Sequence, residues 1–320
     1  MPPVALLEVS GLRVRFGATE VVRGVSFELD RAETLGVVGE SGCGKSMTGY
    51  ALMGMVPRSG SVSGSVRLEG SELVGLPEAA WRKVRGSRIA LVMQDPFASL
   101  NPVMRVGDQI AEVLEVHRGW PRRRAREEAV SLLRQVGVPE PQAAARKYPH
   151  QMSGGQRQRV VIAAAFACRP KVLIADEPTT ALDVTLQAQI LRLIEELQER
   201  EGTAVLLISH DIGVVAAVSD RVAVFYAGRI VETGSAEEVL RRPRHPYSQA
   251  LLAAMPRPGA DRLPTIPGQP PSFTDLPEGC PFGPRCPHRA AACGAEPELA
   301  DAGPVRAACW LAGERASASG

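Results

Sequence analysis

Short segments near the N-terminus alternate between apolar and polar residues. In residues 12–16 and 25–29, apolar side chains stand at every second position. A period of two places these side chains on one face of a strand, which is typical of a half-buried antiparallel sheet. We therefore predict an antiparallel β-sheet in this part of the chain.

Later segments are apolar without alternation. Residues 34–38, 172–175 and 205–208 form short, mainly apolar runs. Such runs, bounded by turn residues, are typical of strands buried on both faces of a parallel sheet. Residues 125–136 carry apolar side chains at helical spacing, and we expect a helical segment at about 96–165. Together these patterns predict an α/β fold.

The composition is that of an ordinary globular protein. The chain has 320 residues, of which 45% are hydrophobic and 22% charged, and its net charge is +2. This length leaves room for one large domain with an appendage, or for two smaller domains. Because the charge is balanced and aromatic residues make up only 4%, the composition argues against nucleic-acid binding.

No apolar run is long enough to cross a membrane. The longest, residues 160–168, is far shorter than the span of about 20 residues that a bilayer requires. The first residues also lack the basic region and apolar core of a secretory signal. We therefore expect a cytoplasmic protein whose role at a membrane depends on a partner.

A glycine-rich loop follows the apolar run 34–38 and precedes helix-compatible residues. It fits the pattern GxxxxGK[ST] and consists of Gly39, Glu40, Ser41, Gly42, Cys43, Gly44, Lys45 and Ser46. In such a loop, backbone N–H groups surround phosphate oxygens, the lysine reaches the β- and γ-phosphates, and the serine hydroxyl ligates Mg²⁺. Lys45 is one of only four lysines among 37 basic residues, which favours a specific role.

Polar side chains follow the two later apolar runs. Asp176 and Glu177 end the first, and His210 comes shortly after the second. Beside a phosphate loop, Asp176 is placed to hold Mg²⁺ through water, and Glu177 to orient or deprotonate the water that attacks the γ-phosphate. At the carboxyl end of a parallel strand, His210 is expected to face the crevice in which open α/β sheets bind ligands.

A second candidate anion site precedes the apolar run 160–165. It consists of Ser153, Gly154, Gly155 and Gln156. The following run indicates that this turn starts a helix, where backbone N–H groups and side-chain donors are exposed. This surface is separate from the phosphate loop.

The order of these motifs resembles the nucleotide-binding subunit of ABC transporters over about residues 4–256. In that family, residues 39–46 correspond to the Walker A loop, 153–156 to the signature motif, and 172–177 to the Walker B strand with its catalytic glutamate. The resemblance implies a P-loop NTPase fold of ABC type, with a RecA-like mixed sheet, an antiparallel β subdomain and a helical subdomain. Its cofactors would be ATP and Mg²⁺.

Further site residues follow from the same resemblance. Gln94 corresponds to the Q-loop glutamine, Asp183 to the D-loop aspartate and His210 to the H-loop switch. Phe16 resembles the aromatic residue that stacks on adenine, although its alternating surroundings equally suit a core residue. The catalytic residues implied are Glu177, His210 and Gln94. The implied Mg²⁺ ligands are Ser46, Gln94 and Asp176.

Longer matches resemble the oligopeptide and dipeptide importer ATPases. They are residues 99–102, 148–151, 175–185 and 245–252. Residues 179–185 resemble the first of that family's two paired ATPases more than the second. The resemblance implies an ATPase that powers import of peptides across the bacterial inner membrane, bound peripherally at its cytoplasmic face. Expected partners are a second paralogous ATPase in a head-to-tail heterodimer, two transmembrane permease subunits and, indirectly, an extracytoplasmic substrate-binding protein.

Two other functions remain as alternatives. The same machinery would also suit import of nickel complexes or another small solute. A soluble ABC ATPase acting on nucleic acid or ribosomes is disfavoured, because the chain shows one copy of each motif and no long coiled-coil insertion.

Four of the six cysteines lie within the last 41 residues: Cys280, Cys286, Cys293 and Cys309. Two of them precede prolines, as in ferredoxin-type turns, and their spacings differ from the Cys-x-x-Cys pairs of structural zinc sites. The peptide-importer resemblance implies a [4Fe–4S] cluster on these residues, with zinc or unligated thiols as alternatives. We predict that residues 257–320 form a C-terminal extension carrying this site and a disordered end.

Overall fold

The computed structural model describes residues 5–180, 182–255 and 265–312. The predicted disordered end and the first residues of the predicted extension therefore lie largely outside the described residues. The chain divides into two compact units, which are described separately. The first contains residues 1–29, 34–74 and 207–320, and the second contains residues 30–33 and 75–206. The predicted boundary between 4–256 and 257–320 stays a prediction.

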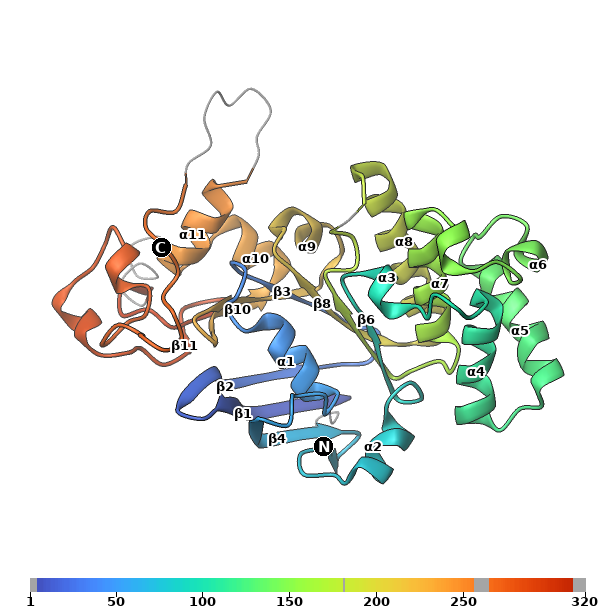
Figure 1. The fold of residues 1–320 in the computed structure, drawn as a ribbon. Coiled ribbons are helices and arrows are strands. Elements are labelled where there is room, and N and C mark those ends of the chain that lie inside the picture. The colour runs from blue at the N-terminus through green and yellow to red at the C-terminus, as the bar shows by residue number, and fades with distance from the viewer. Residues whose placement is uncertain (1–4, 181, 256–264, 313–320) are drawn as a thin grey trace. The chain divides into compact units, whose positions relative to one another are not determined.

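The predicted antiparallel sheet is confirmed in the first unit. Its strands lie in the order β2, β1, β4, β5, and β1, β2 and β4 run side by side in Figure 1. Leu12 and Val14 are fully buried while the intervening Arg13 is exposed, as the alternation requires. The bounds are β1 (Leu7–Phe16), β2 (Thr19–Leu29), β4 (Gly60–Leu68) and β5 (Ser71–Glu72).

The first unit also contains strands of a mixed sheet. β3 (Thr34–Val38) pairs in parallel with β9 (Arg221–Tyr226), and β9 pairs antiparallel with β10 (Arg229–Ser235). On the far side of β10, the short strands β12 (Arg306–Ala307) and β11 (Ala300–Asp301) extend the sheet. Residues near the C-terminus are thereby hydrogen-bonded to the same sheet as the strand that leads into the glycine-rich loop.

Helices of the first unit pack closely on this sheet. At Gly36, in β3, an added Cβ atom would lie 2.2 Å from Cγ1 of Val215, so only glycine allows α9 to approach. The helices are α1 (Lys45–Leu52), α9 (Ile212–Val218), α10 (Ala236–Arg241) and α11 (Pro246–Ala253), with 3₁₀ turns η2 (Gly283–Arg285) and η3 (Ala291–Gly294).

The second unit is mainly helical, as predicted. Within it, β6 (Ile89–Val92) pairs in parallel with β7 (Val172–Asp176). Of the predicted apolar stripe, Ala129, Leu133 and Val136 are buried and Val130 is half-buried. The helices are α2 (Glu78–Val84), α3 (Pro96–Ser99), α4 (Val106–Arg118), α5 (Arg122–Gln135), α6 (Pro141–Ala144), α7 (Gly154–Phe166) and α8 (Val184–Glu201), with the 3₁₀ turn η1 (Pro149–Gln151).

The last of the four passages of the chain between the units lies within a strand. β8 (Ala204–Ser209) is buried along its whole length, and its last three residues belong to the first unit. Within the described part of the chain, no helix combines the length and the apolar character that a membrane span requires.

Candidate nucleotide-hydrolysis site

The glycine-rich loop lies between β3 and α1 in the first unit. Gly44 precedes the first residue of α1 with a φ of 104°, and a Cβ atom there would lie 2.6 Å from the carbonyl oxygen of Val21. At Gly39, a Cβ atom would lie 2.3 Å from the carbonyl oxygen of Phe225. Only glycine fits either position, so the loop lies close to its neighbouring strands. The loop ends at the N-terminus of α1, where backbone N–H groups are available to an anion.

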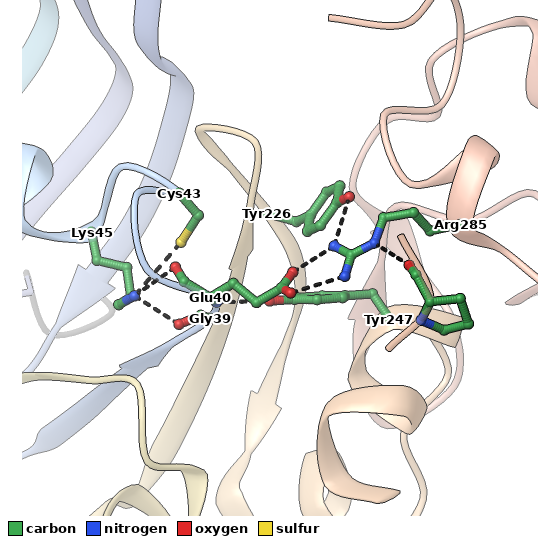
Figure 2. A network of polar contacts seen from close by, with 8 residues as sticks. Gly39, Glu40, Cys43, Lys45, Tyr226, Tyr247 and Arg285 are labelled. Atoms are coloured by element: carbon green, nitrogen blue, oxygen red, sulfur yellow. Dashed lines mark hydrogen bonds and ion pairs between the residues drawn. The ribbon is translucent and has the colours of Figure 1, made fainter. Parts of the chain in front are cut away.

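The side chain of Lys45 is folded into the loop itself. Its Nζ atom donates to the carbonyl oxygen of Gly39 at 2.7 Å and to that of Glu40 at 3.0 Å, and lies 3.7 Å from Sγ of Cys43 (Figure 2). The residue is 4% exposed. A buried ammonium group needs compensating acceptors, and here the loop backbone supplies them.

Phe16 also belongs to the first unit, at the end of β1. It pairs with Gly60 of β4, where an added Cβ atom would lie 2.7 Å from Cε1 of the ring. The ring is half-buried against the glycine backbone. Its predicted stacking on adenine stays a prediction.

Gln94 and Glu177 meet in the second unit, although 83 residues separate them. Nε2 of Gln94 donates to Oε2 of Glu177 at 3.0 Å, and Oγ1 of Thr180 donates to the same oxygen at 2.8 Å. Glu177 has a φ of 49°, in the left-handed region that is strained for a non-glycine residue. The turn after β7 thus fixes the direction of the Glu177 carboxylate, while Asp176, the last residue of the strand, is 5% exposed.

The turn at residues 153–156 begins α7, as predicted. The N–H of Gln156 donates to Oγ of Ser153 at 3.3 Å, and the N–H of Ser153 donates to Oε1 of Gln156 at 3.2 Å. This reciprocal cap satisfies two of the end groups and leaves Gly154 exposed at the helix N-terminus. A Cβ atom at Gly155 would lie 2.5 Å from Cδ2 of Leu186 in α8, so any side chain at this position would displace that leucine.

Two further predicted residues lie at helix starts. Asp183 caps α8, because its Oδ1 accepts the N–H of Leu186 at 2.9 Å. His210 is exposed between β8 and α9, and the next residue, Asp211, caps α9 by accepting the N–H of Gly213 at 2.8 Å. Both residues therefore stand at positions that backbone capping fixes.

The predicted site residues are divided between the two units of the chain. Phe16, the loop 39–46 and His210 belong to the first unit, whereas Gln94, 153–156, Asp176, Glu177 and Asp183 belong to the second. Sequence reasoning missed Thr180, which contacts Glu177, and Arg285, which pairs with Glu40. Arg285 carries no local signal, because 245 residues separate it from its partner.

A glycine-rich phosphate loop and a carboxylate pair at the end of a buried strand define the class of P-loop ATPases. Comparison with known proteins narrows this class. The profile described as ABC transporter matches residues 22–180, and the one described as oligopeptide/dipeptide transporter, C-terminal region, matches residues 231–293. The chain belongs to the ABC transporter ATP-binding family and is an ABC-type ATPase.

Relatives and solved structures agree with this assignment. The oligopeptide transport ATP-binding protein OppD of Haemophilus influenzae is 49% identical over 97% of this chain and 98% of its own length. The dipeptide transport ATP-binding protein DppD of Bacillus subtilis is 45% identical over 97% and 96%. The ATP-binding cassette MJ0796, solved as a post-hydrolysis dimer with ADP and Pi, is 25% identical with a TM-score of 0.64, covering 72% of this chain and 98% of that one.

The predicted metal site at the four cysteines is wrong. Among the described residues, no group of three or more His, Cys, Asp or Glu side chains is arranged so that it could hold a metal ion. Burial raises the pKa of Cys280 and of Cys309, whereas cluster and zinc ligands are thiolates. Sγ of Cys286 and Sγ of Cys293 instead accept backbone N–H groups at 3.4 and 3.5 Å. The predictions of a [4Fe–4S] cluster and of zinc at these cysteines are therefore both wrong.

The predicted heterodimer is corrected as well. The names of the matched relatives each describe one ATP-binding protein and include no second, paired ATPase chain.

Proposed function

We propose that this chain is the ATP-hydrolysing subunit that powers import of di- and oligopeptides through a separate permease. The contact between Gln94 and Glu177 carries the proposal, because it presents an oriented carboxylate as the base for water. The substrate class rests on the relatives, which are named as oligopeptide or dipeptide transport proteins. We assign residues 4–256 to the nucleotide-binding domain and 257–320 to a C-terminal extension.

In the proposed reaction, Lys45 exchanges its carbonyl acceptors for oxygens of the β- and γ-phosphates. Glu177, held by Gln94 and Thr180, orients the attacking water and accepts its proton. Gln94 and His210 sense the γ-phosphate. Phe16, which is half-buried at the end of β1, stacks on the adenine.

The proposed ligands of Mg²⁺ are all oxygen donors. The ligands would be the hydroxyl of Ser46, the amide oxygen of Gln94 and, through water, the carboxylate of Asp176. Magnesium prefers oxygen ligands and retains several waters. Because Nε2 of Gln94 donates to Glu177, the amide group is oriented by its nitrogen, and its oxygen is the atom suited to a cation. The ion would neutralise charge on the phosphates.

We further propose that two ATPase chains work head to tail. The signature turn of one chain, 153–156, would then bind the nucleotide held by the phosphate loop of the other. The capped N-terminus of α7 supports this, since its exposed end at Gly154 suits an anion. Asp183 would lie in the same interface.

The remaining partners follow from the relatives, whose names place them in transport. They would be two permease subunits, with which this chain forms a peripheral complex at the cytoplasmic face of the inner membrane, and a substrate-binding protein on the other side. No nucleic acid is involved.

The test is reconstitution of the complete transporter in liposomes with a labelled oligopeptide. We expect peptide uptake that depends on ATP, and we expect Lys45→Ala to abolish both uptake and hydrolysis. Arg306→Ala, which removes an exposed arginine near the C-terminus, is the matched control. We expect it to retain both peptide uptake and ATP hydrolysis. Uptake of labelled nickel but not of peptide would overturn the substrate class, and hydrolysis stimulated by nucleic acid without the permease would overturn the transport function.

A further inference from the structure

We infer that Arg285 is a positioning residue for the phosphate loop, because it anchors and neutralises Glu40, the loop's own carboxylate. This inference rests on the proposed binding of ATP by residues 39–46. It assigns a role in nucleotide binding to the region near the C-terminus, which lies outside the nucleotide motifs of the sequence.

Arg285 and Glu40 form a two-pronged ion pair inside the first unit. Nη1 of Arg285 lies 2.6 Å from Oε2 of Glu40, and Nη2 lies 2.9 Å from Oε1. The Arg285 side chain is 5% exposed and that of Glu40 24%. Parallel contacts of this kind fix direction as well as charge. Figure 2 shows the guanidinium facing the carboxylate at the edge of the loop.

The position of Arg285 is itself determined by other neighbours. Its Nε donates to the carbonyl oxygen of Pro267 at 2.8 Å, and Nη1 donates to the hydroxyl of Tyr226 at 3.2 Å. The guanidinium also lies 5.8 Å from the ring centre of Tyr226 and 5.9 Å from that of Phe282. Its hydrogen bonds to Glu40 are the largest cause of a raised pKa of Arg285. The arginine is therefore held in place and charged where Glu40 meets it.

A second contact holds the backbone of Glu40. Its N–H donates to the hydroxyl of Tyr247 at 2.8 Å. Tyr247, in α11, is fully buried and packs against Tyr226 and Phe282, with ring centres 4.6 and 5.4 Å away. Both the backbone and the side chain of Glu40 are thus fixed by residues that follow the nucleotide motifs in the sequence.

The charge of Glu40 explains why this anchor matters for binding. Nucleotide phosphates carry several negative charges, and an unpaired carboxylate in the loop would repel them. It would also compete for Lys45, whose Nζ already contacts the Glu40 carbonyl oxygen. A cavity of about 330 Å³, lined by residues 40–43 and 269–273, leaves the freed side chain room to move. Arg285 keeps the carboxylate paired and directed away from Lys45.

The test is titration of the full-length chain with Mg²⁺–ATP by calorimetry. We expect Arg285→Ala to weaken ATP binding about tenfold, because a charged, two-pronged contact is lost. Adding Glu40→Gln to Arg285→Ala should restore affinity to within about twofold of the unmodified chain, since the repelling charge is gone. The ATP affinity of Arg285→Lys should lie between those of Arg285→Ala and the unmodified chain, because lysine keeps the charge but not the paired geometry.

Steady-state hydrolysis provides a second readout. The change should appear in KM for ATP and leave kcat nearly unaltered, since the anchor acts on binding rather than on water activation. Arg306→Ala is the matched control, because this arginine belongs to the same region, contacts Asp301 and lies apart from the loop.

Each outcome decides the inference. Unchanged affinity in Arg285→Ala overturns it, and so does a loss that Glu40→Gln fails to restore, because that result means a merely structural role. If Arg285→Ala does not fold, the same rescue is measured in Arg285→Lys. If Lys45→Ala leaves ATP binding intact, the proposed nucleotide site fails instead, whatever Arg285 does.

Discussion

At the scale of single residues, the proposed hydrolysis mechanism depends most on the carboxylate of Glu177. Glu177→Gln keeps the shape of the side chain but removes its ability to accept a proton. We expect kcat to fall by about 10²- to 10³-fold while ATP binding is retained. Steady-state hydrolysis and nucleotide titration measure the two effects. Glu195→Gln on the exposed face of α8 is the control, and near-normal turnover in Glu177→Gln would reject Glu177 as the base.

The buried imidazole of His245 makes stability depend on pH. Burial lowers its pKa from 6.5 to about 4, and its Nδ1 accepts the N–H of Tyr247 at 3.0 Å, which caps α11. Between these values the unfolded chain binds a proton that the folded chain does not. The free energy of unfolding therefore falls by up to about 3 kcal/mol as the pH falls from 7 to 4. The stabilisation that comes from the neutral His245 is fully present only above a pH of about 6.5.

Urea unfolding at several pH values checks this effect. His245→Asn offers a similar helix cap without a titrating ring. We expect the stability advantage of the unmodified chain over this variant to shrink as the pH falls through the window. Glu232, whose pKa is raised by burial, contacts the backbone N–H of residue 245 in both proteins and cancels in the difference. An advantage that stays constant with pH would contradict the assignment.

At the scale of elements, α3 and α7 pack against each other in the second unit, and their contacts include a cation–π pair. The guanidinium of Arg157, in α7, lies 3.4 Å from the ring centre of Phe97, in α3. Its Nε donates to the carbonyl oxygen of Met152 at 2.9 Å, while its Nη1 is buried with no hydrogen-bond acceptor among the described residues. Burial also lowers the pKa of Arg157. Since α3 follows Gln94 and Ser153 caps α7, this contact joins the segment that carries Gln94 to the turn proposed to bind the nucleotide of the partner chain.

Phe97→Ala tests whether the contact couples these segments. We expect the free energy of unfolding to fall by only about 0.5–1 kcal/mol, the usual worth of an exposed cation–π contact. We expect kcat to fall several-fold, because the signature turn is no longer held relative to Gln94. Thermal melts and hydrolysis assays measure both, with Val116→Ala at another exposed apolar position as the control. Loss of stability without loss of turnover would limit Phe97 to packing.

At the scale of the whole molecule, periodicity predicted the elements better than it predicted distant contacts. The alternation at 12–16 and the buried run at 172–175 each depend on local neighbours, and both strands formed as expected. That Gln94 and Glu177 are both site residues was implied by family resemblance, but the hydrogen bond between them was not predicted, because no local pattern spans 83 residues. The pairing of Glu40 with Arg285 had no sequence signal of any kind.

The wrong prediction at the cysteines also shows that spacing along the sequence does not determine how side chains are arranged in space. Four cysteines close together in sequence suggested a shared ligand set, but spacing along a proline-rich segment does not fix where each sulfur points. Cys280 and Cys293 are joined through the backbone, by an N–H donated to a carbonyl oxygen at 2.9 Å. The segment is therefore organised by main-chain contacts, and its thiols do not converge as metal ligands among the described residues.

Glu296 is one of the residues that hold the C-terminal region to the rest of the first unit, beside the pairing of β12 with β10. Its Oε2 lies 2.7 Å from Nη2 of Arg23, in β2, and its Oε1 lies 3.0 Å from Nη1 of Arg229, in β10. All three side chains are less than a third exposed, so solvent screens the pairs only in part. We expect Glu296→Ala to lower the free energy of unfolding by about 1–3 kcal/mol, because two arginines lose their shared partner.

This variant links stability of the region to nucleotide binding. Because Arg285 belongs to the same region, loosening the attachment through Glu296 should also weaken ATP binding, though less than removal of Arg285 itself. Urea unfolding and ATP titration measure the two changes, with Glu298→Ala, an exposed neighbour, as the control. Reduced stability with unchanged ATP affinity would show that the pairing of Arg285 with Glu40 is maintained without the Glu296 contacts.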